Sequence, residues 1–390
     1  MIVLAAAARG QHLSAASAIV LDADTGKVLF AKDADTARFP ASTTKIMTTL
    51  LLLERCKPDD IIVAPPDVEK VKQASMHLKP GERVKVRDMA YALMLRSAND
   101  GCYAVACHIS GSVEAFAKLM NERAKEIGCT QTQFNNPHGL NDTKHTISAR
   151  DLALIAREAM RIPTFREIVR TQKKPIVRST NLEDLVMINK NRLLKAEPTY
   201  EGIKTGWTIP AGKCFVGSAT RNGYRLLTVV LKSDDWVKDT KLLTDWAFRG
   251  HDRLVFFRPG EVVGAPAIVR GGQKERLQVS TPVPGRSVVP KGLSRFADYR
   301  MEWEPLDAPV RKGQRVGELV FTDAGGFEQR LPLEAAEDIE PATIAGIVGT
   351  TGSKTWTWVV AGGLLVSGAV LMRRKARNFA PAQAPTRRRS

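Results

Sequence analysis

The hydrophobic pattern of this chain changes its period near residue 200. Before that point, apolar residues recur at helical spacing in segments bounded by Ser, Gly or Asn, which predicts helices at 42–53, 88–96, 100–109, 112–127 and 148–160. Short apolar runs around turn residues predict hairpins at 17–31 and 215–231, followed by a helix at 238–249. Because strands lie at both ends with helices between them, residues 13–252 are expected to form an α+β domain whose antiparallel sheet joins the two chain ends.

The pattern changes again after residue 255, where short β-rich runs alternate with turns that contain Pro and Gly. Residues 255–338 are therefore predicted to form a small all-β domain, interpreted as a sandwich. Residues 341–354 are rich in Gly, Thr and Ser and are expected to be a linker. The N-terminal residues 1–12 end their apolar run in small residues, which indicates a signal-peptide remnant.

Residues 355–372 carry no charge, and 18 helical residues span about 27 Å, just enough to cross a bilayer. Trp356 and Trp358 suit one membrane interface, and the basic residues 373–390 suit a cytoplasmic tail. We therefore expect a single transmembrane helix that leaves the preceding part of the chain outside the cytoplasm. A buried core helix at the C-terminus is the alternative.

Composition places the chain among globular proteins, since its 390 residues are 44% hydrophobic and 25% charged, and this length favours two domains. The net charge of +17 is compatible with nucleic acid, or with an anionic cell envelope or membrane surface. No zinc-finger spacing, RNA-recognition signature or interleaving of aromatic and basic residues accompanies the charge. No nucleic-acid partner is therefore expected.

Cysteine usage gives no sign of a metal site. The number of cysteines is odd, which forbids complete pairing, and no Cys-x-x-Cys spacing occurs. Four of the five fall in predicted apolar segments, so buried thiols are expected. The five are Cys56, Cys102, Cys107, Cys129 and Cys214.

The first candidate for chemistry is the pair Ser42 and Lys45, which follows Pro40 and opens an apolar run. Residues three apart lie on one face of a helix. A serine hydroxyl becomes a good nucleophile when a base takes its proton, and a lysine can act as that base when burial or positive charge lowers its pKa. A helix starting at Ser42 also favours a developing oxyanion there. In isolation, however, Ser-x-x-Lys is more often an N-cap serine followed by a solvated lysine.

Two further motifs follow in order along the chain. Ser97-Ala98-Asn99 interrupts two predicted helices, where a loop can direct short polar side chains into a cleft. Lys204-Thr205-Gly206, followed by Trp207, lies just before a predicted strand. A lysine and a threonine there can bind an anionic substrate group, and the glycine lets substrate lie along the strand edge. Each triplet is common alone, but the three in this order indicate a single active site.

On these motifs the chain resembles the low-molecular-mass penicillin-binding proteins of peptidase family S11, the serine-type D-alanyl-D-alanine carboxypeptidases. The resemblance covers about residues 15–250, with 255–338 similar to the family's C-terminal β domain, and segments 75–82, 136–140 and 189–194 also resemble family segments. It implies a β-lactamase/transpeptidase-like fold and a role in bacterial cell-wall maturation at the cell membrane. It further implies a peptidoglycan stem peptide as substrate, β-lactam antibiotics as inhibitors, and no metal or organic cofactor.

The resemblance assigns catalytic roles to four residues. Ser42 would be acylated by the penultimate D-alanine carbonyl of the stem peptide, and Lys45 would accept its proton. Ser97 would relay a proton to the leaving amine, while Asn99 would orient Lys45 and the substrate amide. Ala98 stands where the family more often carries Gly or Asp.

The resemblance likewise assigns substrate contacts to the third motif. Lys204 would supply positive potential, and Thr205 would contact the terminal carboxylate beside Gly206. The backbone N–H groups of Ser42 and Trp207 would form the oxyanion hole. Trp207 stands where some family members carry histidine, which leaves the shape of the cleft and its response to pH open.

Three other functions share parts of this pattern. A serine β-lactamase needs a carboxylate for its deacylating water, yet no Glu-x-x-Leu-Asn-like stretch follows the second motif. A DD-endopeptidase of cross-links is closer, because substrate choice cannot be read from these motifs. A non-catalytic β-lactam sensor remains the third alternative, although every candidate catalytic side chain is present.

His108, His138 and His145 are interpreted as structural rather than catalytic.

Overall fold

The computed structural model describes residues 13–293 and 296–342. Contacts divide the described residues into two compact units, one with 13–258, 284–293, 296–300 and 320–330, the other with 259–283, 301–319 and 331–342. The expected signal-peptide remnant, transmembrane helix and basic tail lie outside the described residues, and the domain boundary near 252–255 stays a prediction. Within 13–293 and 296–342, no helix is both long and apolar enough to cross a bilayer.

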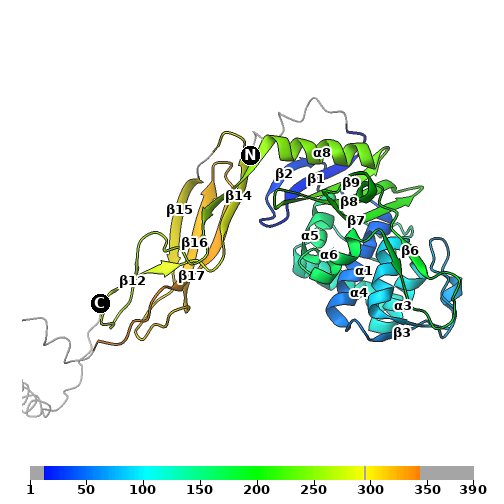
Figure 1. The fold of residues 1–390 in the computed structure, drawn as a ribbon, viewed down its shortest axis with the longest axis horizontal. Coiled ribbons are helices and arrows are strands. Elements are labelled where there is room, and N and C mark those ends of the chain that lie inside the picture. The colour runs from blue at the N-terminus through cyan, green and yellow to red at the C-terminus, as the bar shows by residue number, and fades with distance from the viewer. Residues whose placement is uncertain (1–12, 294–295, 343–390) are drawn as a thin grey trace, which may run out of the picture. The chain divides into compact units, whose positions relative to one another are not determined.

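The first unit is built on a five-stranded antiparallel sheet with the strand order β2-β1-β9-β8-β7 (Figure 1). The N-terminal strand β1 pairs with β9, with Ile19 opposite Val229, so the sheet joins the two ends of this part of the chain as expected. Strand β7 lies at one edge. The strands are β1 Ser17–Asp22, β2 Val28–Lys32, β7 Tyr200–Thr208, β8 Gly212–Arg221 and β9 Tyr224–Ser233.

The two faces of this sheet are covered by different helices, because alternate residues of a strand point to opposite faces. Ile19 and Leu21 belong to a core shared with the helical cluster, whereas Ala18 and Val20 pack in a core with α8 (Trp236–Gly250). Figure 1 shows α8 on one side of the sheet and α5, α6 and α1 on the other. Ile19 is fully buried, and burying one such side chain contributes about 1.5–3 kcal/mol.

The predicted helices are confirmed to within a few residues, with four differences. The first helix begins as a 3-10 turn and the second ends in a π turn. Two helices, α6 and the short α7, were not predicted, although Pro163 suits the first turn of α6. The elements are the 3-10 turn Ala41–Thr44, α1 Lys45–Arg55, α2 Val86–Tyr91, the π turn Ala92–Arg96, α3 Asn99–Ser110, α4 Val113–Ile127, α5 Ala149–Ala159, α6 Pro163–Arg170 and the short α7 Leu193–Ala196.

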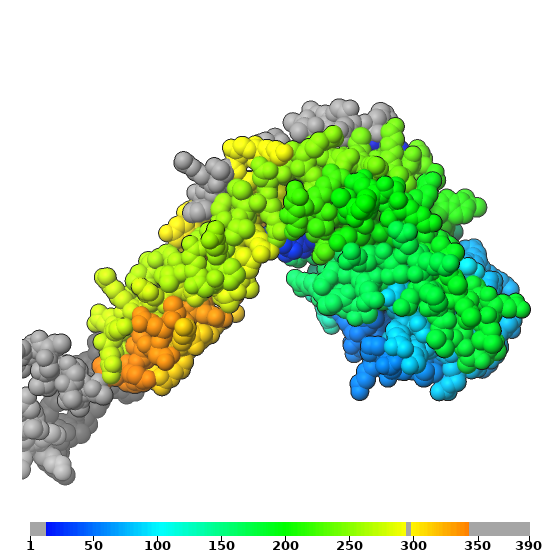
Figure 2. All heavy atoms as spheres, in the orientation of Figure 1, coloured from blue at the N-terminus to red at the C-terminus, as the bar shows by residue number. Residues whose placement is uncertain are grey.

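Two small hairpins, which the hydrophobic pattern did not predict, flank the helical cluster. β3 Ile61–Val63 pairs with β4 Arg83–Lys85, and β5 Lys173–Pro175 pairs with β6 Val186–Ile188. An isolated bridge joins Val84 to Arg178. In Figure 2, green surface from the later part of this unit adjoins blue and cyan surface from its earlier part. Two segments almost one hundred residues apart in sequence are therefore neighbours next to the second motif.

The described residues after 250 are organised in strands, as the sequence pattern predicts. One sheet has the order β13-β17-β16-β15, and two further strand pairs are β10-β14 and β11-β12. Their arrangement as a sandwich stays a prediction. The strands are β10 His251–Phe257, β11 Ala267–Ile268, β12 Arg276–Leu277, β13 Val279–Ser280, β14 Gly285–Pro290, β15 Phe296–Trp303, β16 Arg315–Asp323 and β17 Glu328–Ala335.

Candidate active site

The structure brings Ser42 and Lys45 into direct contact at the junction of the 3-10 turn and α1. The Lys45 ammonium donates to the Ser42 hydroxyl, with 3.2 Å between Nζ and Oγ. Side chains three residues apart are eclipsed on a 3-10 turn, so this local geometry itself sets the contact. Lys45 is 0% exposed, whereas Ser42 stays partly accessible in a cleft. The pair is therefore not the solvated serine and lysine of a chance match.

Lys45 is held by neutral acceptors rather than by a carboxylate. Its Nζ donates to Asn99 Oδ1 at 2.7 Å and to the His138 carbonyl oxygen at 2.7 Å. Burial lowers the pKa of Lys45 to about 8, and the positive charge of Lys190 acts in the same direction. The Cys102 thiol and the Asp100 carboxylate oppose this shift. A substantial fraction of Lys45 is thus a neutral amine near pH 8, which is what a proton acceptor for Ser42 requires.

The second motif is positioned by a break between two helices. The π turn Ala92–Arg96 ends at Ser97, whose backbone is left-handed with φ of 68°, and Asn99 is the first residue of α3. Ser97 Oγ is buried, and it has no hydrogen-bond partner among the described residues. A buried hydroxyl without a partner is costly in a folded protein. Ser97 lines a cleft, so a bound substrate can supply the missing hydrogen-bond partner of its hydroxyl.

The third motif lies inside strand β7, not just before a strand as predicted. Lys204 is 2% exposed, and its Nζ donates to the Thr205 carbonyl oxygen at 3.0 Å. Burial holds the pKa of Lys204 well below its usual value, and the charges of Lys45 and Lys190 lower it further. This environment disfavours the ammonium form of Lys204, and an arriving carboxylate would favour that charged form again.

Gly206 was expected to make room for substrate along the strand edge, but the structure shows that it makes room for the turn that carries Ser42. A Cβ at this position would lie 3.0 Å from the Ser42 backbone nitrogen and 3.1 Å from the Pro40 carbonyl oxygen. The missing side chain therefore lets edge strand β7 approach the 3-10 turn that carries the nucleophile. Trp207, the next residue, is 63% exposed and projects from this edge.

These groups surround one cleft of about 650 Å³. Ser42, Ser97 and Thr205 contribute hydroxyl-bearing side chains to it from three separate elements. Among the described residues, those that line this cleft include cationic side chains but no carboxylate. The lining residues are Ser42, Gln73, Ala74, Ser97, Lys190, Arg192, Thr205, Gly206, Trp207, Lys213 and Trp236.

The segment 136–140 contributes more than the sequence indicated. His138 supplies the carbonyl that holds Lys45, and burial lowers the pKa of its imidazole to about 3. Asn136 Oδ1 accepts from the backbone N–H groups of His138 at 3.2 Å and Gly139 at 2.7 Å, which fixes the loop. The sequence contained the needed signal, an Asn followed by Pro and Gly, but not the direction of the His138 carbonyl.

His145 supports the same turn from behind. Its Nδ1 accepts from the backbone N–H of Asn135 at 3.0 Å, so the neutral ring carries its proton on Nε2 and donates to Thr44 Oγ1 at 2.9 Å. Burial lowers the pKa of His145 to about 4, which keeps the ring neutral. Thr44 Oγ1 donates in turn to the Ala41 carbonyl at 2.9 Å, and Ala41 has a left-handed φ of 48°. His145 is thus structural, as predicted, but it stabilises the backbone next to the candidate nucleophile.

Gly139 provides a test of this backbone arrangement. A Cβ there would lie 1.8 Å from the Ala41 carbonyl oxygen, and its φ is +87°. We expect Gly139→Ala to displace the Ala41 turn and to reduce both the thermal stability and the acylation of Ser42, because the left-handed backbone alone costs about 1–2 kcal/mol for alanine.

The matched control is Gly111→Ala, since Gly111 has a similar φ of +78° but a Cβ there meets nothing within 4 Å. The left-handed backbone destabilises both variants, but only Gly139→Ala also introduces a clash with the Ala41 carbonyl oxygen. The measurement is the melting temperature together with the rate of labelling by fluorescent penicillin. Equal labelling rates in the two folded variants would show that the Ala41 contact does not position Ser42.

The comparisons with known proteins agree with this geometry. The family model of D-alanyl-D-alanine carboxypeptidases matches residues 4–235, a range that includes all three motifs. The chain belongs to the D-alanyl-D-alanine carboxypeptidase family. It is 33% identical over 341 residues to D-alanyl-D-alanine carboxypeptidase DacF of Bacillus subtilis, covering 84% of this chain and 86% of that one. It is also 32% identical over 348 residues to DacC of Escherichia coli, covering 85% of each chain.

Solved structures that are similar to this chain share its fold. Penicillin-binding protein 5 from Haemophilus influenzae matches 85% of this chain and 98% of its own, with a TM-score of 0.71 and 27% identity. The Streptomyces K15 DD-transpeptidase matches 61% of this chain and 98% of its own, with a TM-score of 0.58 and 29% identity. The α+β fold expected from the sequence is therefore confirmed, and the chain is a serine-type DD-carboxypeptidase of cell-wall metabolism.

Proposed function

We propose that Ser42 is the nucleophile of this carboxypeptidase and that it removes the terminal D-alanine from peptidoglycan stem pentapeptides. The observation that carries the proposal is the buried Lys45 amine, 3.2 Å from the Ser42 hydroxyl, with its pKa lowered to about 8. A general base whose pKa lies close to the working pH is both available and strong enough to accept a proton.

Acylation then proceeds by two proton movements. Ser42 Oγ attacks the carbonyl carbon of the penultimate D-alanine while its proton passes to the Lys45 amine. The oxyanion is stabilised by the backbone N–H groups of Ser42 and Trp207. When the tetrahedral intermediate collapses, the C–N bond breaks and Ser97 relays a proton to the departing amine of D-alanine. The otherwise unpartnered Ser97 hydroxyl supports this role.

Substrate is proposed to bind along the outer edge of β7. An edge strand has free backbone groups that can pair with an extended peptide. Thr205 would hydrogen-bond the terminal carboxylate, and the approach of that carboxylate would favour the protonated form of Lys204, which would then contribute positive potential. The position of β7 at the edge of the sheet, against the 3-10 turn, supports this orientation.

Water completes the cycle by hydrolysing the Ser42 ester, and Lys45 can again accept the proton. A β-lactam forms the same ester, but its cleaved amide nitrogen stays attached to the acyl group and remains in the cleft. Deacylation by water is then expected to be slow, so β-lactams act as inhibitors. No metal or organic cofactor enters any of these steps.

The cleft composition favours this function over a β-lactamase. Fast deacylation of a β-lactam needs a group that activates water, and no carboxylate is among the described lining residues of the cleft. A DD-endopeptidase remains the second candidate, because the three motifs are shared by enzymes that act on stem peptides and on cross-links. A non-catalytic sensor is disfavoured by the complete set of polar side chains around Ser42.

The membrane attachment is proposed from the sequence alone. The uncharged residues 355–372 would span the cell membrane once, with residues 373–390 in the cytoplasm and the catalytic unit outside. Such an arrangement would place the cleft beside peptidoglycan.

The test is product release by the full-length protein in detergent. D-alanine should be released from diacyl-Lys-D-Ala-D-Ala much faster than cross-linked muropeptide dimers or a chromogenic cephalosporin are cleaved. Since one similar solved structure is that of a DD-transpeptidase, an amino acceptor is included to measure transfer against hydrolysis. Preferential cleavage of dimers would instead establish the endopeptidase.

A further inference from the structure

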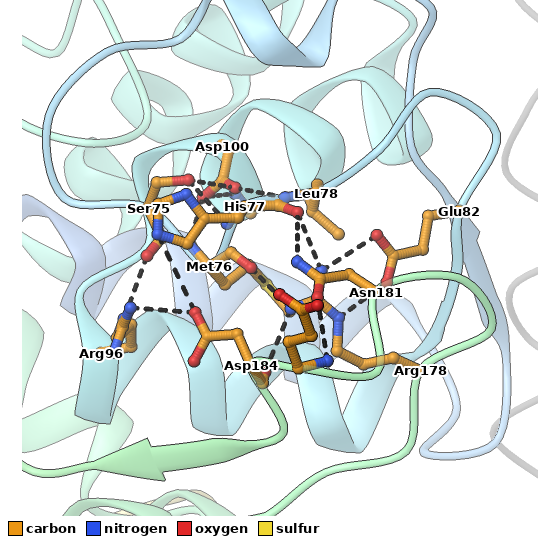
Figure 3. A network of polar contacts seen from close by, with 12 residues as sticks. Ser75, Met76, His77, Leu78, Glu82, Arg96, Asp100, Arg178, Asn181 and Asp184 are labelled. Carbon is orange, nitrogen blue, oxygen red and sulfur yellow. Dashed lines mark hydrogen bonds and ion pairs between the residues drawn. The ribbon is translucent and has the colours of Figure 1, made fainter.

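A fully buried ion pair lies beside the second motif and plays no part in the proposed chemistry. Arg178 and Glu82 have side chains that are 0% exposed, and Arg178 binds both carboxylate oxygens, at 2.7 and 3.0 Å. Figure 3 shows the Arg178 guanidinium between Glu82 and the segment that contains Met76 and His77. Such a pair is not needed for stability as such, because well-packed apolar residues often serve equally well.

The remaining guanidinium protons bind backbone carbonyls of two loops. Arg178 donates to the carbonyl oxygens of Met76 at 2.6 Å, His77 at 3.1 Å and Asp184 at 3.1 Å. All five donors of the planar fork are therefore committed, two to Glu82 and three to carbonyls. Arginine alone among the side chains has this many donors in fixed directions.

The loop held by Arg178 is in turn bound to both flanks of the second motif. Asp100, just after Asn99, accepts from Ser75 Oγ at 2.7 Å and from the backbone N–H groups of Met76 at 3.1 Å and Leu78 at 2.9 Å. Arg96, just before Ser97, donates to the Ser75 carbonyl at 3.0 Å and to Asp184 at 2.9 Å (Figure 3).

Asn99 of the second motif is also hydrogen-bonded to the backbone just before the loop 75–78. The Asn99 backbone N–H donates to the Ala74 carbonyl at 2.7 Å, and the Asn99 side-chain Nδ2 donates to the Lys72 carbonyl at 3.1 Å. Ser97 has a left-handed backbone with φ of 68°. A non-glycine residue keeps such a conformation only when the surrounding contacts determine it.

We propose that Arg178 is a positioning residue for the reaction. Together with Glu82 it fixes residues 75–78, and through Arg96 and Asp100 this segment sets the orientation of Ser97 and Asn99 toward Ser42 and Lys45. Arg178 itself touches neither substrate nor reacting atoms. The inference rests on the proposed roles of the second motif, and it adds a residue that neither the motifs nor the family match assigns.

The decisive variant replaces both members of the pair, Arg178→Met with Glu82→Met. The double change leaves no unpaired buried charge, so folding is expected to survive, but three carbonyls lose the donor that orders the loop. A displacement of about 1 Å in a reacting group can lower a rate about 10²-fold. We therefore expect the rate constant of Ser42 acylation by fluorescent penicillin to fall by about that factor.

The effects of the double variant on kcat and on KM distinguish a positioning role of Arg178 from general damage to the fold. The terminal carboxylate is proposed to bind Thr205 on β7, which none of the named contacts of Arg178 includes. For D-alanine release, kcat should therefore fall while KM changes less than about threefold. The control is Arg123→Met with Glu54→Met, since Arg123 also binds its glutamate through two nitrogens, at 2.8 and 3.2 Å, but lies on α4 away from the lining of the cleft. The control should acylate at the wild-type rate.

A second variant, Arg178→Lys, covers the case in which the double variant does not fold. Lysine keeps the charge opposite Glu82, yet its three donors cannot serve all five acceptor positions. It should lower the acylation rate about tenfold with the melting temperature largely retained. A folded double variant, or a folded Arg178→Lys variant, that acylates at the wild-type rate overturns the proposal. Failure of the wild-type protein to be acylated would instead overturn the proposed function.

Discussion

Replacing Ser42 with alanine is expected to reduce D-alanine release about 10⁵–10⁶-fold, the loss that follows removal of the nucleophile in other serine acyl-transfer enzymes. The fold should be unaffected, because Lys45 keeps its bonds to Asn99 Oδ1 and the His138 carbonyl, each at 2.7 Å. The measurement is kcat/KM for diacyl-Lys-D-Ala-D-Ala, alongside the melting temperature.

A matched control is Ser110→Ala, at the opposite end of α3 from Asn99. It removes the same atom from the same unit of the protein and should retain wild-type activity. If Ser42→Ala kept more than a few per cent of wild-type turnover while folded, another residue would have to form the acyl-enzyme, and the assignment of Ser42 would fail.

Lys45→Met is expected to lower the acylation rate about 10²–10⁴-fold, because it removes the general base while filling most of the same volume. In the wild-type protein, burial lowers the pKa of Lys45 to about 8, so the neutral form that can accept a proton gains population as pH rises through that value. The rate of penicillin acylation should therefore rise nearly tenfold per pH unit below about pH 8 and level off above it.

Lys45→Arg distinguishes a base from a fixed positive charge. Arginine stays protonated at every accessible pH, so it can supply potential but cannot accept the Ser42 proton. The account predicts that this variant, where it folds, is as inactive as Lys45→Met. Substantial activity in Lys45→Arg, or a wild-type acylation rate that is flat between pH 6 and 9, would count against Lys45 as the proton acceptor.

Much of this site could be predicted because its geometry is local. Ser42 and Lys45 meet through one turn of backbone, so their spacing in the sequence already implies the contact. The break that presents Ser97 also has a local cause, since polar residues interrupt two amphipathic helices. The pairing of β1 with β9 was expected from two hairpins at the ends of one α+β domain.

The positions of β7 and Gly206 depended on packing that the sequence pattern does not show. The strand Tyr200–Thr208 contains charged residues and two glycines, which weaken any strand signal. Its pairing, with Gly206 opposite Cys214, follows from contacts with β8 and with the turn that carries Ser42. The sequence therefore grouped the third motif with Ser42, whose cleft it lines, but placed it outside the strand.

Arg178 could not be recognised from the sequence for a related reason. It lies in a polar stretch where an arginine is ordinarily solvated, and its partner Glu82 is 96 residues away. Only the packing of the β5–β6 hairpin against the β4 region reveals that both charges are buried. The contact of His145 with Thr44 could not be predicted from the sequence either, because it spans 101 residues.

Ser42 is proposed to form the covalent intermediate, and all of the proposed chemistry depends on it. The most direct measurement is to treat the full-length protein with benzylpenicillin, digest it, and locate the adduct by mass spectrometry. We expect one penicilloyl group, carried by the peptide that contains Ser42 and lost in Ser42→Ala. An adduct on any other residue, or none on a folded protein, would contradict it.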